Sequence, residues 1–478
     1  MHKVFTKFAT LRIIQPSKVE PTAVFIRNKL ILREKTNKDI TARLALDGSQ
    51  QPVHTYYGAT HAGTSDATHR SIVLATSLAD SALRAAPLIT FEFDIPGAFL
   101  NNNPLTRDHT GQTQLCTRMT SDLPPPYGDA LCEVVGAHYG LKQSNHIYDQ
   151  DLIKLLVQDG FQQTPSHPYT FIKFSTTNPP DKLIVSMHVD DGDGNTTSPA
   201  MYSDFKTLIQ NRYGPIEFHS PSRGTCGQVQ QVNADNSVTL HYGPYILKML
   251  TRIGMDSVPP ALSPDVEGLF NPSTDPIPLY PSATAEFRTV NGELIHLLPA
   301  RHDIRKVVTY LLTLGEHPDN SAYLKQFHLL RYLKGTPCLG PTFSTNPSDY
   351  PNGVEVHSSS DCAHNVHSTT GQSHSAHTLT VGAVGANTAP FLSYSAKEKG
   401  VSLSPTEGEY VALSRTAKDI LHFRQFASDL GYPQTQPSIM LTDNTSSIKL
   451  TKAPLVRLNP AISTLSTTIF VGPTKTTK

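Results

Sequence analysis

Three aspartates of this 478-residue chain follow apolar segments in a way that could support chemistry. Asp94 ends the segment LITFEFDI, in which apolar and polar residues alternate as they do in a strand. Asp190 and Asp191 follow the apolar segment KLIVSMHV. Adjacent carboxylates repel each other at the end of an apolar strand, so a cation or a basic group must offset them. Mg²⁺ prefers carboxylate oxygens together with substrate phosphates, and a pair of such ions supports phosphoryl transfer.

Two other interpretations of the aspartate pair are a solvated turn and a calcium-binding loop. An adjacent pair of aspartates in a turn is most often a solvated turn, and the sequence DGDGN also resembles the start of a calcium-binding loop. Counted from Asp191, the sixth position is Thr196 instead of glycine and the twelfth is Tyr202 instead of glutamate. The calcium-loop spacing therefore fails.

Elements that could position Asp94 are predicted on both sides of it. The segments AVFIRNKLIL and ITARLALDG, within 23–55, mix β-branched and basic residues and predict short strands. Apolar residues at helical spacing over 68–86 predict a helix that begins at Thr68. A strand over 88–95 follows, and residues 103–130 are expected to form loops.

The aspartate pair is predicted to lie at the tip of a hairpin. A helix is expected over 145–160, ending at Gly160. Strands are expected over 171–174 and 182–189, and the sequence DDGDGN after the second strand is typical of a turn.

The C-terminal part has a different pattern. Residues 256–281 contain seven prolines and predict a linker or an extended connection. Helices are predicted over 303–316 and 319–334, the second capped by Asp319 or Asn320. A compact α/β domain is then predicted from six segments. They are three strand-like segments (353–360, 377–384 and 389–395), a helix (406–430), a strand (438–443) and a short helix (446–450).

Composition limits the class of protein. Lys plus Arg and Asp plus Glu both total 40, so the net charge gives no sign of a nucleic-acid partner, although a basic groove could lie beside an acidic site. The five cysteines form no CxxC pair, which argues against a disulfide scaffold or a zinc module and favours a reducing compartment. No signal peptide or membrane-length apolar segment is found, so we expect an intracellular protein, cytoplasmic or nuclear, without a membrane partner.

The order of motifs along the chain resembles the reverse transcriptase and ribonuclease H part of copia-type LTR retrotransposon polyproteins. The motifs are ITARLALDG, FEFDIPGAFLNN, AHYGLKQS, SMHVDDGDG, GPYILKMLTRIGM, LLRYLKGT, SLSPTEGEYVAL and LTDNTSSIKL, and they cover roughly 25–452. The resemblance implies an α+β polymerase with palm and fingers, a helical thumb-connection region and an α/β ribonuclease H-like domain. The expected parts are an N-terminal extension (1–22), fingers and palm (23–255), a Pro-rich linker with the helical thumb and connection (256–345), a ribonuclease H-like domain (346–452) and an unstructured tail (453–478).

The resemblance assigns roles in the polymerase half. Asp94, Asp190 and Asp191 match the metal-binding catalytic aspartates. Phe99 matches the aromatic beneath the incoming sugar, although it could be an ordinary core residue. Arg43 matches a basic residue near the triphosphate, although it could be an ordinary surface arginine. The segment that shapes the nucleotide and template pocket is matched by Tyr139, Gly140, Leu141, Lys142 and Gln143.

The ribonuclease H half departs from the family pattern. Glu409 and Asp443 match two of its metal-binding carboxylates, but Ser359 falls where the first aspartate is usual. Asp361 could replace that aspartate only if the strand register slips, and a slip of one residue would turn its side chain to the other face.

The resemblance implies an RNA-directed DNA polymerase that acts on an RNA or DNA template-primer with deoxynucleoside triphosphates and two Mg²⁺ ions in each active site. The alternative is a decayed transposon relic that at most binds nucleic acid. The alternative is favoured by Ser359, by the absence of tryptophan and by Ser144-Asn145-His146 after YGLKQ.

Overall fold

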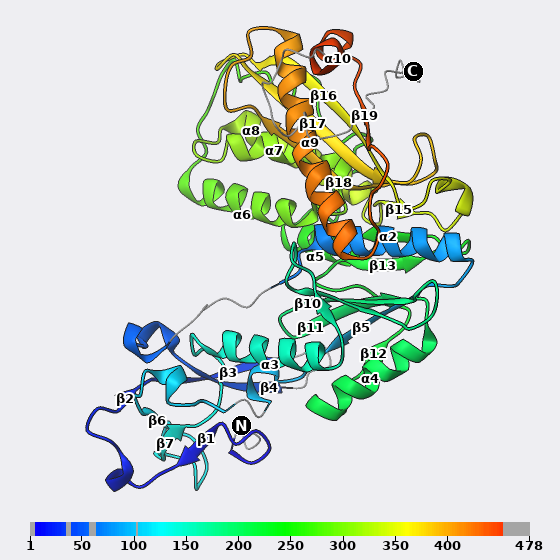
Figure 1. Ribbon diagram of the computed structural model, residues 1–478. Coiled ribbons are helices and arrows are strands. Elements are labelled where there is room, and N and C mark those ends of the chain that lie inside the picture. The colour runs from blue at the N-terminus through cyan, green and yellow to red at the C-terminus, as the bar shows by residue number, and fades with distance from the viewer. Residues whose placement is uncertain (1–4, 35–39, 57–63, 102–103, 453–478) are drawn as a thin grey trace.

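The computed structural model describes residues 5–34, 40–56, 64–101 and 104–452. An N-terminal unit and a C-terminal unit lie at opposite ends, with a six-stranded central sheet and helices between them (Figure 1). The tail expected over 453–478 lies outside the described residues.

The N-terminal unit is a four-stranded sheet in the order β1-β7-β6-β2 with a separate hairpin of β3 and β4. Its strands are β1 (Leu11–Ile13), β2 (Val24–Phe25), β3 (Asn28–Glu34), β4 (Ile40–Leu46), β6 (Leu115–Arg118) and β7 (Leu131–Val134). The prediction of a separate extension over 1–22 is wrong, because Leu11 pairs with Val134 inside this sheet. The prediction of loops alone over 103–130 is also wrong, because β6 is an inner strand with buried Leu115 and Cys116.

The central sheet has the order β12-β5-β11-β10-β9-β8, with antiparallel pairing throughout. Its strands are β5 (Ile89–Asp94), β8 (Gln162–Gln163), β9 (Thr170–Phe174), β10 (Lys182–His188), β11 (Asp191–Thr196) and β12 (Phe218–His219). Two helices cover one face, α3 (Ser144–Gln158) and α4 (Pro199–Tyr213), and share an aromatic core with the sheet. The predicted β5, β9, β10 and α3 are confirmed, and Gly160 follows α3 with a φ of +90°.

Strand β11 corrects the expectation of a turn at DDGDGN. Residues Asp191 to Thr196 form a central strand between β10 and β5. A Cβ at Gly192 would lie 2.3 Å from the ring of Phe93, and a Cβ at Gly194 would lie 2.3 Å from the ring of Phe91. The glycines are needed because the aromatic rings of β5 occupy the space that side chains on β11 would fill.

A helical layer follows the central sheet. It contains α5 (Gly243–Arg252), α6 (Pro281–Leu297), α7 (Arg305–Thr313) and α8 (Asn320–Gly335) beside the sheet β13-β14-β15 (Val229–Val232, Val238–His241, Thr342–Phe343). The sequence predicted α7 and α8 but not α4, α5 or α6, and of the two predicted caps of α8, Asp319 and Asn320, the structure has Asp319. Residues 256–280 contain no helix or strand and lie along α8, where Lys334 Nζ donates to the carbonyl of Val258 at 2.8 Å.

The C-terminal unit is a sheet in the order β18-β17-β16-β19 with helix α9 packed on it. Its elements are β16 (Val356–His367), β17 (Gln372–Val381), β18 (Pro390–Lys397), α9 (Pro405–Asp429), β19 (Ile439–Leu441) and α10 (Thr445–Lys452). Strand β19 runs parallel to β16 at the sheet edge, with Ser359 opposite Leu441. The predicted order of strands and helices is confirmed.

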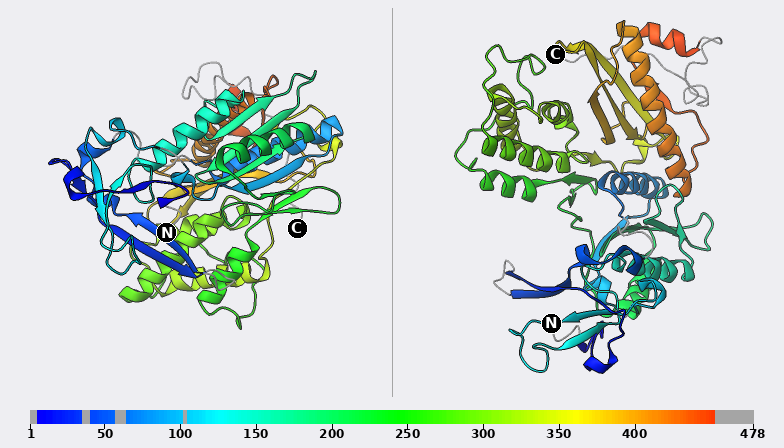
Figure 2. Two further views of the ribbon diagram at one scale, coloured as in Figure 1. Left: turned by 90° about the horizontal axis from the view of Figure 1, so that it is seen from below. Right: turned by 90° about the vertical axis from the view of Figure 1, so that its left-hand side faces the viewer.

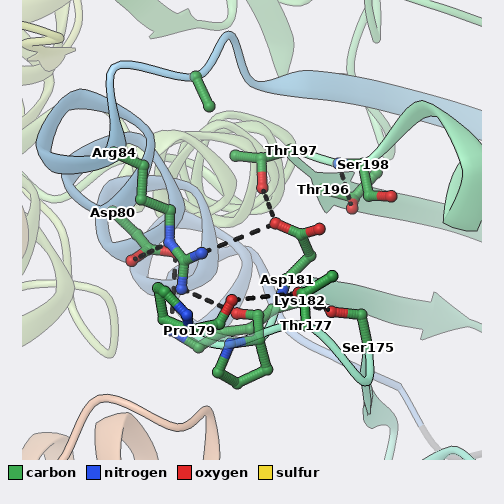
Figure 3. A network of polar contacts seen from close by, with 12 residues as sticks. Asp80, Arg84, Ser175, Thr177, Pro179, Asp181, Lys182, Thr196, Thr197 and Ser198 are labelled. Carbon is green, nitrogen blue, oxygen red and sulfur yellow. Dashed lines mark hydrogen bonds and ion pairs between the residues drawn. The ribbon is translucent and has the colours of Figure 1, made fainter.

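Helix α2 (Ala67–Arg84) joins the units, because it packs on the central sheet on one side and on β17 and β18 on the other (Figure 2). Its cap is Asp66, whose carboxylate accepts from the amides of Thr68 and His69, and not the predicted Thr68. Figure 3 shows the other end, where Arg84 lies 3.1 Å from Asp80 and 3.6 Å from Asp181 at the start of β10. One apolar core runs through α2 from the central sheet to the C-terminal sheet.

Candidate active sites

Strand pairing brings Asp94 and Asp191 together. They are direct partners in the antiparallel β5–β11 pair, so their side chains leave the same face of the sheet. Asp190 precedes Asp191 in the turn, and its carbonyl accepts a hydrogen bond from the amide of Ile95 at 3.0 Å. Residues that are distant in sequence therefore meet at one end of two neighbouring strands.

The hairpin tip that carries the aspartates is strained and anchored. His188 pairs with Asp191, and Val189 between them has a φ of +62°, which is unfavourable for a β-branched side chain. The strand before the tip pairs with β11 along one edge, and Met187 is held along the other edge, where Ser65 N donates to its carbonyl at 2.8 Å and its own N donates to the carbonyl of Tyr169 at 2.9 Å. The surrounding chain thus holds the turn in a conformation that it would not adopt alone.

The electrostatics of the aspartates indicate uncompensated negative charge. Desolvation and the charge of Asp190 raise the pKa of Asp94, while Arg43 lowers it. Desolvation, followed by the charges of Asp190 and Asp94, raises the pKa of Asp191. The three carboxylates do not bring one oxygen each to within 4.8 Å of one another, so the group is more open than a single-ion cage.

A fourth acidic residue, Asp193, lies on the same face two residues along β11. It is buried, and its carboxylate lies 3.9 Å from Nε of the buried Arg70 on α2. Burial raises the pKa of Asp193 to about 6, although Arg70 opposes the shift. This pair, which the sequence did not reveal, positions β11 against α2.

Arg43, Tyr139 and Phe99 lie beside the aspartates. The Arg43 guanidinium lies 5.6 Å from the centre of the Tyr139 ring, and its charge reaches Asp94. Burial raises the pKa of Tyr139, Arg43 opposes this shift, and the charges of Asp190 and Asp94 add to it. Phe99 meets the edges of Tyr139 and Tyr148, with ring centres 5.8 Å apart in both pairs. The structure therefore gathers three of the predicted nucleotide-site residues around Asp94.

The rest of the predicted segment packs against the N-terminal unit. Gly140 has a φ of +89°, and a Cβ there would lie 1.9 Å from the carbonyl oxygen of Leu46, so only glycine fits. Leu141 is buried in the core of that unit. Lys142 Nζ lies 3.3 Å from the hydroxyl of Tyr56. Gln143 is buried and accepts from Gln51 Nε2 at 2.8 Å, so it supports the site and does not face Asp94.

The C-terminal unit contains a second acidic cluster. One carboxylate oxygen each from Asp361 on β16, Glu409 on α9 and Asp443 after β19 lie within 4.8 Å of one another. The expectation that Asp361 would need a register slip is wrong. Asp361 is two residues from Ser359, and since side chains alternate along β16, both leave the same exposed face.

Glu409 is the buried member of this cluster. Its Oε1 accepts from the amide of Cys362 at 3.3 Å, and a side-chain hydrogen bond with Thr442 also favours the ionised carboxylate. Its Oε2 is buried and accepts no hydrogen bond of good geometry within the described residues. Burial, followed by the charges of Asp361 and Asp443, raises the pKa of Glu409 to about 7. A buried carboxylate oxygen aimed at two other carboxylates fits a divalent cation.

The fold can be compared with solved structures. It is similar to that of the foamy viral protease-reverse transcriptase in complex with double-stranded DNA, with a TM-score of 0.52 and 14% identity over 98% of this chain and 68% of that one. The fold is therefore a mixed α/β fold of the reverse transcriptase kind. No family model matches the sequence.

Curated relatives confirm the predicted resemblance to retrotransposon polyproteins. The chain is 25% identical over 438 residues to the retrovirus-related Pol polyprotein from transposon RE1 of Arabidopsis thaliana. It is 24% identical over 338 residues to the one from transposon TNT 1-94 of Nicotiana tabacum. These matches cover 89% and 67% of this chain, but only 27% and 24% of the relatives, so the chain spans about a quarter of their length. In the described part of the chain, no helix is long and apolar enough to cross a membrane.

Proposed function

We propose that this chain is the reverse transcriptase region of a copia-type retrotransposon Pol polyprotein and that it catalyses RNA-directed DNA synthesis. The observation that carries the proposal is the pairing of Asp94 with Asp191 across β5 and β11, with Asp190 at the adjoining turn. In this assignment the central sheet is the palm, the N-terminal unit the fingers, and α5 to α8 the thumb and connection.

The residues around Asp94 have distinct tasks in this reaction. Arg43, whose charge lowers the pKa of Asp94, would bind the triphosphate. Phe99, held between two tyrosine edges, would form the floor beneath the sugar of the incoming nucleotide. Gly140 and Gln143 would keep the fingers packed on this segment, so that Arg43 stays above the aspartates.

The carboxylates fit the two Mg²⁺ ions that the family uses. Desolvation and mutual repulsion raise the pKa of both Asp94 and Asp191, so ionised aspartates there need added positive charge. Mg²⁺ ions, when bound, would activate the primer 3′-hydroxyl and stabilise the leaving oxygen of the triphosphate. The solved foamy viral relative, in complex with double-stranded DNA, supports a template-primer duplex as the partner.

A second activity, cleavage of the RNA strand of a hybrid, is favoured by the cluster of Asp361, Glu409 and Asp443. Asp361 would supply the carboxylate that Ser359 lacks, and the buried Glu409 Oε2, which accepts no hydrogen bond of good geometry within the described residues, would bind a cation. The test is cleavage of labelled RNA in a hybrid by the parent and by Glu409→Gln. Glu407→Gln is the matched control, because Glu407 is exposed and Gln can also accept from the amide of Leu403. Cleavage that survives Glu409→Gln would refute this assignment.

Primer extension on an RNA template tests the polymerase proposal. With Mg²⁺ and deoxynucleoside triphosphates, the parent is expected to extend the primer, and Asp190→Asn to lose at least about 10³-fold in rate. Asp204→Asn, on the opposite face of the sheet in α4, should keep the parent rate. If the parent does not extend the primer, the chain is instead a relic that at most binds nucleic acid.

A further inference from the structure

Three histidines from separate parts of the chain meet where the central sheet joins the C-terminal unit. His69 lies in the first turn of α2, His167 in the loop between β8 and β9, and His422 on α9. One ring nitrogen of each lies within 4.8 Å of the others. The Nε2 of His422 lies 3.4 Å from Nε2 of His69 and 3.0 Å from Nε2 of His167.

Nε2 of His69 and Nε2 of His167 both lie within 3.4 Å of Nε2 of His422, and the rings of His69 and His167 lie against each other with their centres 3.2 Å apart. Asp66 Oδ2 lies 2.6 Å from Nδ1 of His69. A carboxylate only accepts hydrogen bonds, so when His69 is neutral its proton is on Nδ1 and its Nε2 carries the lone pair. A carboxylate behind a histidine is the usual support of a metal-binding imidazole.

We propose that His69, His167 and His422 form a zinc site that fastens the central sheet to the C-terminal unit. Zn–N bonds of about 2.0–2.1 Å at tetrahedral angles put ligand nitrogens about 3.3–3.4 Å apart, close to the two distances to His422, and the rings of His69 and His167, whose centres lie 3.2 Å apart, would turn apart to hold the ion. Imidazole ligands select Zn²⁺ and its transition-metal neighbours over Mg²⁺, which prefers oxygen.

The surroundings give the site a structural role. Within the described residues, no fourth side chain completes the group, and the exposed His422 leaves a side open to water as the fourth ligand. Ser166, next to His167, also binds α9 through its amide, 3.1 Å from Asp429 Oδ2. His167 precedes Tyr169, whose carbonyl binds the β10 strand just before the aspartate hairpin. A bound zinc would therefore link α9 to the strand that carries Asp190.

Zinc binding by the full chain tests the proposal. The chain is stripped with a chelator, titrated with ZnCl₂ in excess Mg²⁺ to occupy the carboxylate clusters, and analysed for bound zinc and melting temperature. One zinc per chain is expected, with a higher melting temperature because zinc binds the folded state. His422→Asn should lose most of the affinity, and since His422 is exposed the variant should still fold.

Two further variants separate the site from adventitious binding. Asp66→Asn keeps a good helix cap but loses the supporting carboxylate, and should bind zinc about 10–100-fold more weakly. His317→Asn removes a histidine whose side chain is 90% exposed elsewhere, and should bind zinc like the parent. The proposal is overturned if the parent binds no zinc, or if His422→Asn binds it as tightly as the parent.

Discussion

At the scale of single residues, Glu409 links charge to stability most directly. Its pKa is about 7 in the folded chain against an ordinary 4.5, owing to burial and then to Asp361 and Asp443. Between these two values the folded state binds more protons than the unfolded state, so the free energy of unfolding falls as pH rises from about 4.5 to 7.

Glu409→Gln is expected to remove this dependence. Without Mg²⁺ at pH 8, the variant should be more stable than the parent by about 1 kcal/mol, a value reduced for solvent screening, and the two should converge near pH 4. Denaturant unfolding at both pH values measures the difference. A parent whose stability does not fall over this range would show that Glu409 is not under the repulsion described here.

Asp361 also shows the limit of sequence reasoning at this scale. The sequence placed Glu409 and Asp443 in one site, and the structure brings them together. The sequence did not assign Asp361 to the site with certainty, because the family pattern has its aspartate at position 359. The structure shows that positions 359 and 361 lie on the same exposed face of β16. The three histidines of the proposed zinc site form no local spacing motif in the sequence. They could not be grouped from the sequence, because only the fold brings α2 and α9 to the loop between β8 and β9.

At the scale of elements, β11 depends on its glycines. Gly192→Ala would place a methyl group 2.3 Å from the Phe93 ring, and the sheet or the ring must move. We expect a loss of about 1–3 kcal/mol in the free energy of unfolding, as in other overpacked cores. Thermal or denaturant unfolding measures it.

The matched control is Gly292→Ala in α6, where a Cβ meets nothing within 4 Å. Alanine favours an exposed helix position, so this variant should gain about 0.5–1 kcal/mol. Equal effects of the two substitutions would contradict the packing described for β11.

The same elements show which predictions the sequence could support. Alternation was sufficient to predict β5, and the apolar segment KLIVSMHV was sufficient to predict β10, which is buried on both faces. The helix α9 was also predicted from the sequence. Such patterns were insufficient to predict β11, because its two glycines are typical of a turn. The need for glycine becomes clear only in the structure, where the aromatic rings of β5 pack against β11. The patterns also missed α6, because its first residue, Pro281, ends a proline-rich stretch and was assigned to the linker, although proline suits the first turn of a helix.

At the scale of the whole molecule, α2 is the shared core element. Its buried aliphatic side chains lie in one apolar core with the central sheet, the helical layer and the C-terminal sheet. Tyr432, after α9, is buried against the same region, with Lys182 Nζ 3.6 Å from its ring centre. The C-terminal unit is therefore expected to stabilise the central sheet and the helical layer.

A fragment that ends at residue 345 should consequently melt at least about 5 °C below the full chain, because several buried apolar side chains of α2 become exposed. A fragment ending at Lys452 keeps every described contact of α2 and is the control. Scanning calorimetry of the three proteins measures the shift. Equal melting temperatures for the short fragment and the full chain would mean that the two halves fold independently.

We propose that Asp94 and the Asp190–Asp191 hairpin form one polymerase centre. The single-turnover rate of adding one nucleotide to a primer on an RNA template, with the parent, Asp94→Asn and Asp204→Asn, tests this directly. We expect extension by the parent, a loss of at least about 10³-fold for Asp94→Asn, and an unchanged rate for Asp204→Asn. An Asp94→Asn protein that extends the primer as fast as the parent would contradict it.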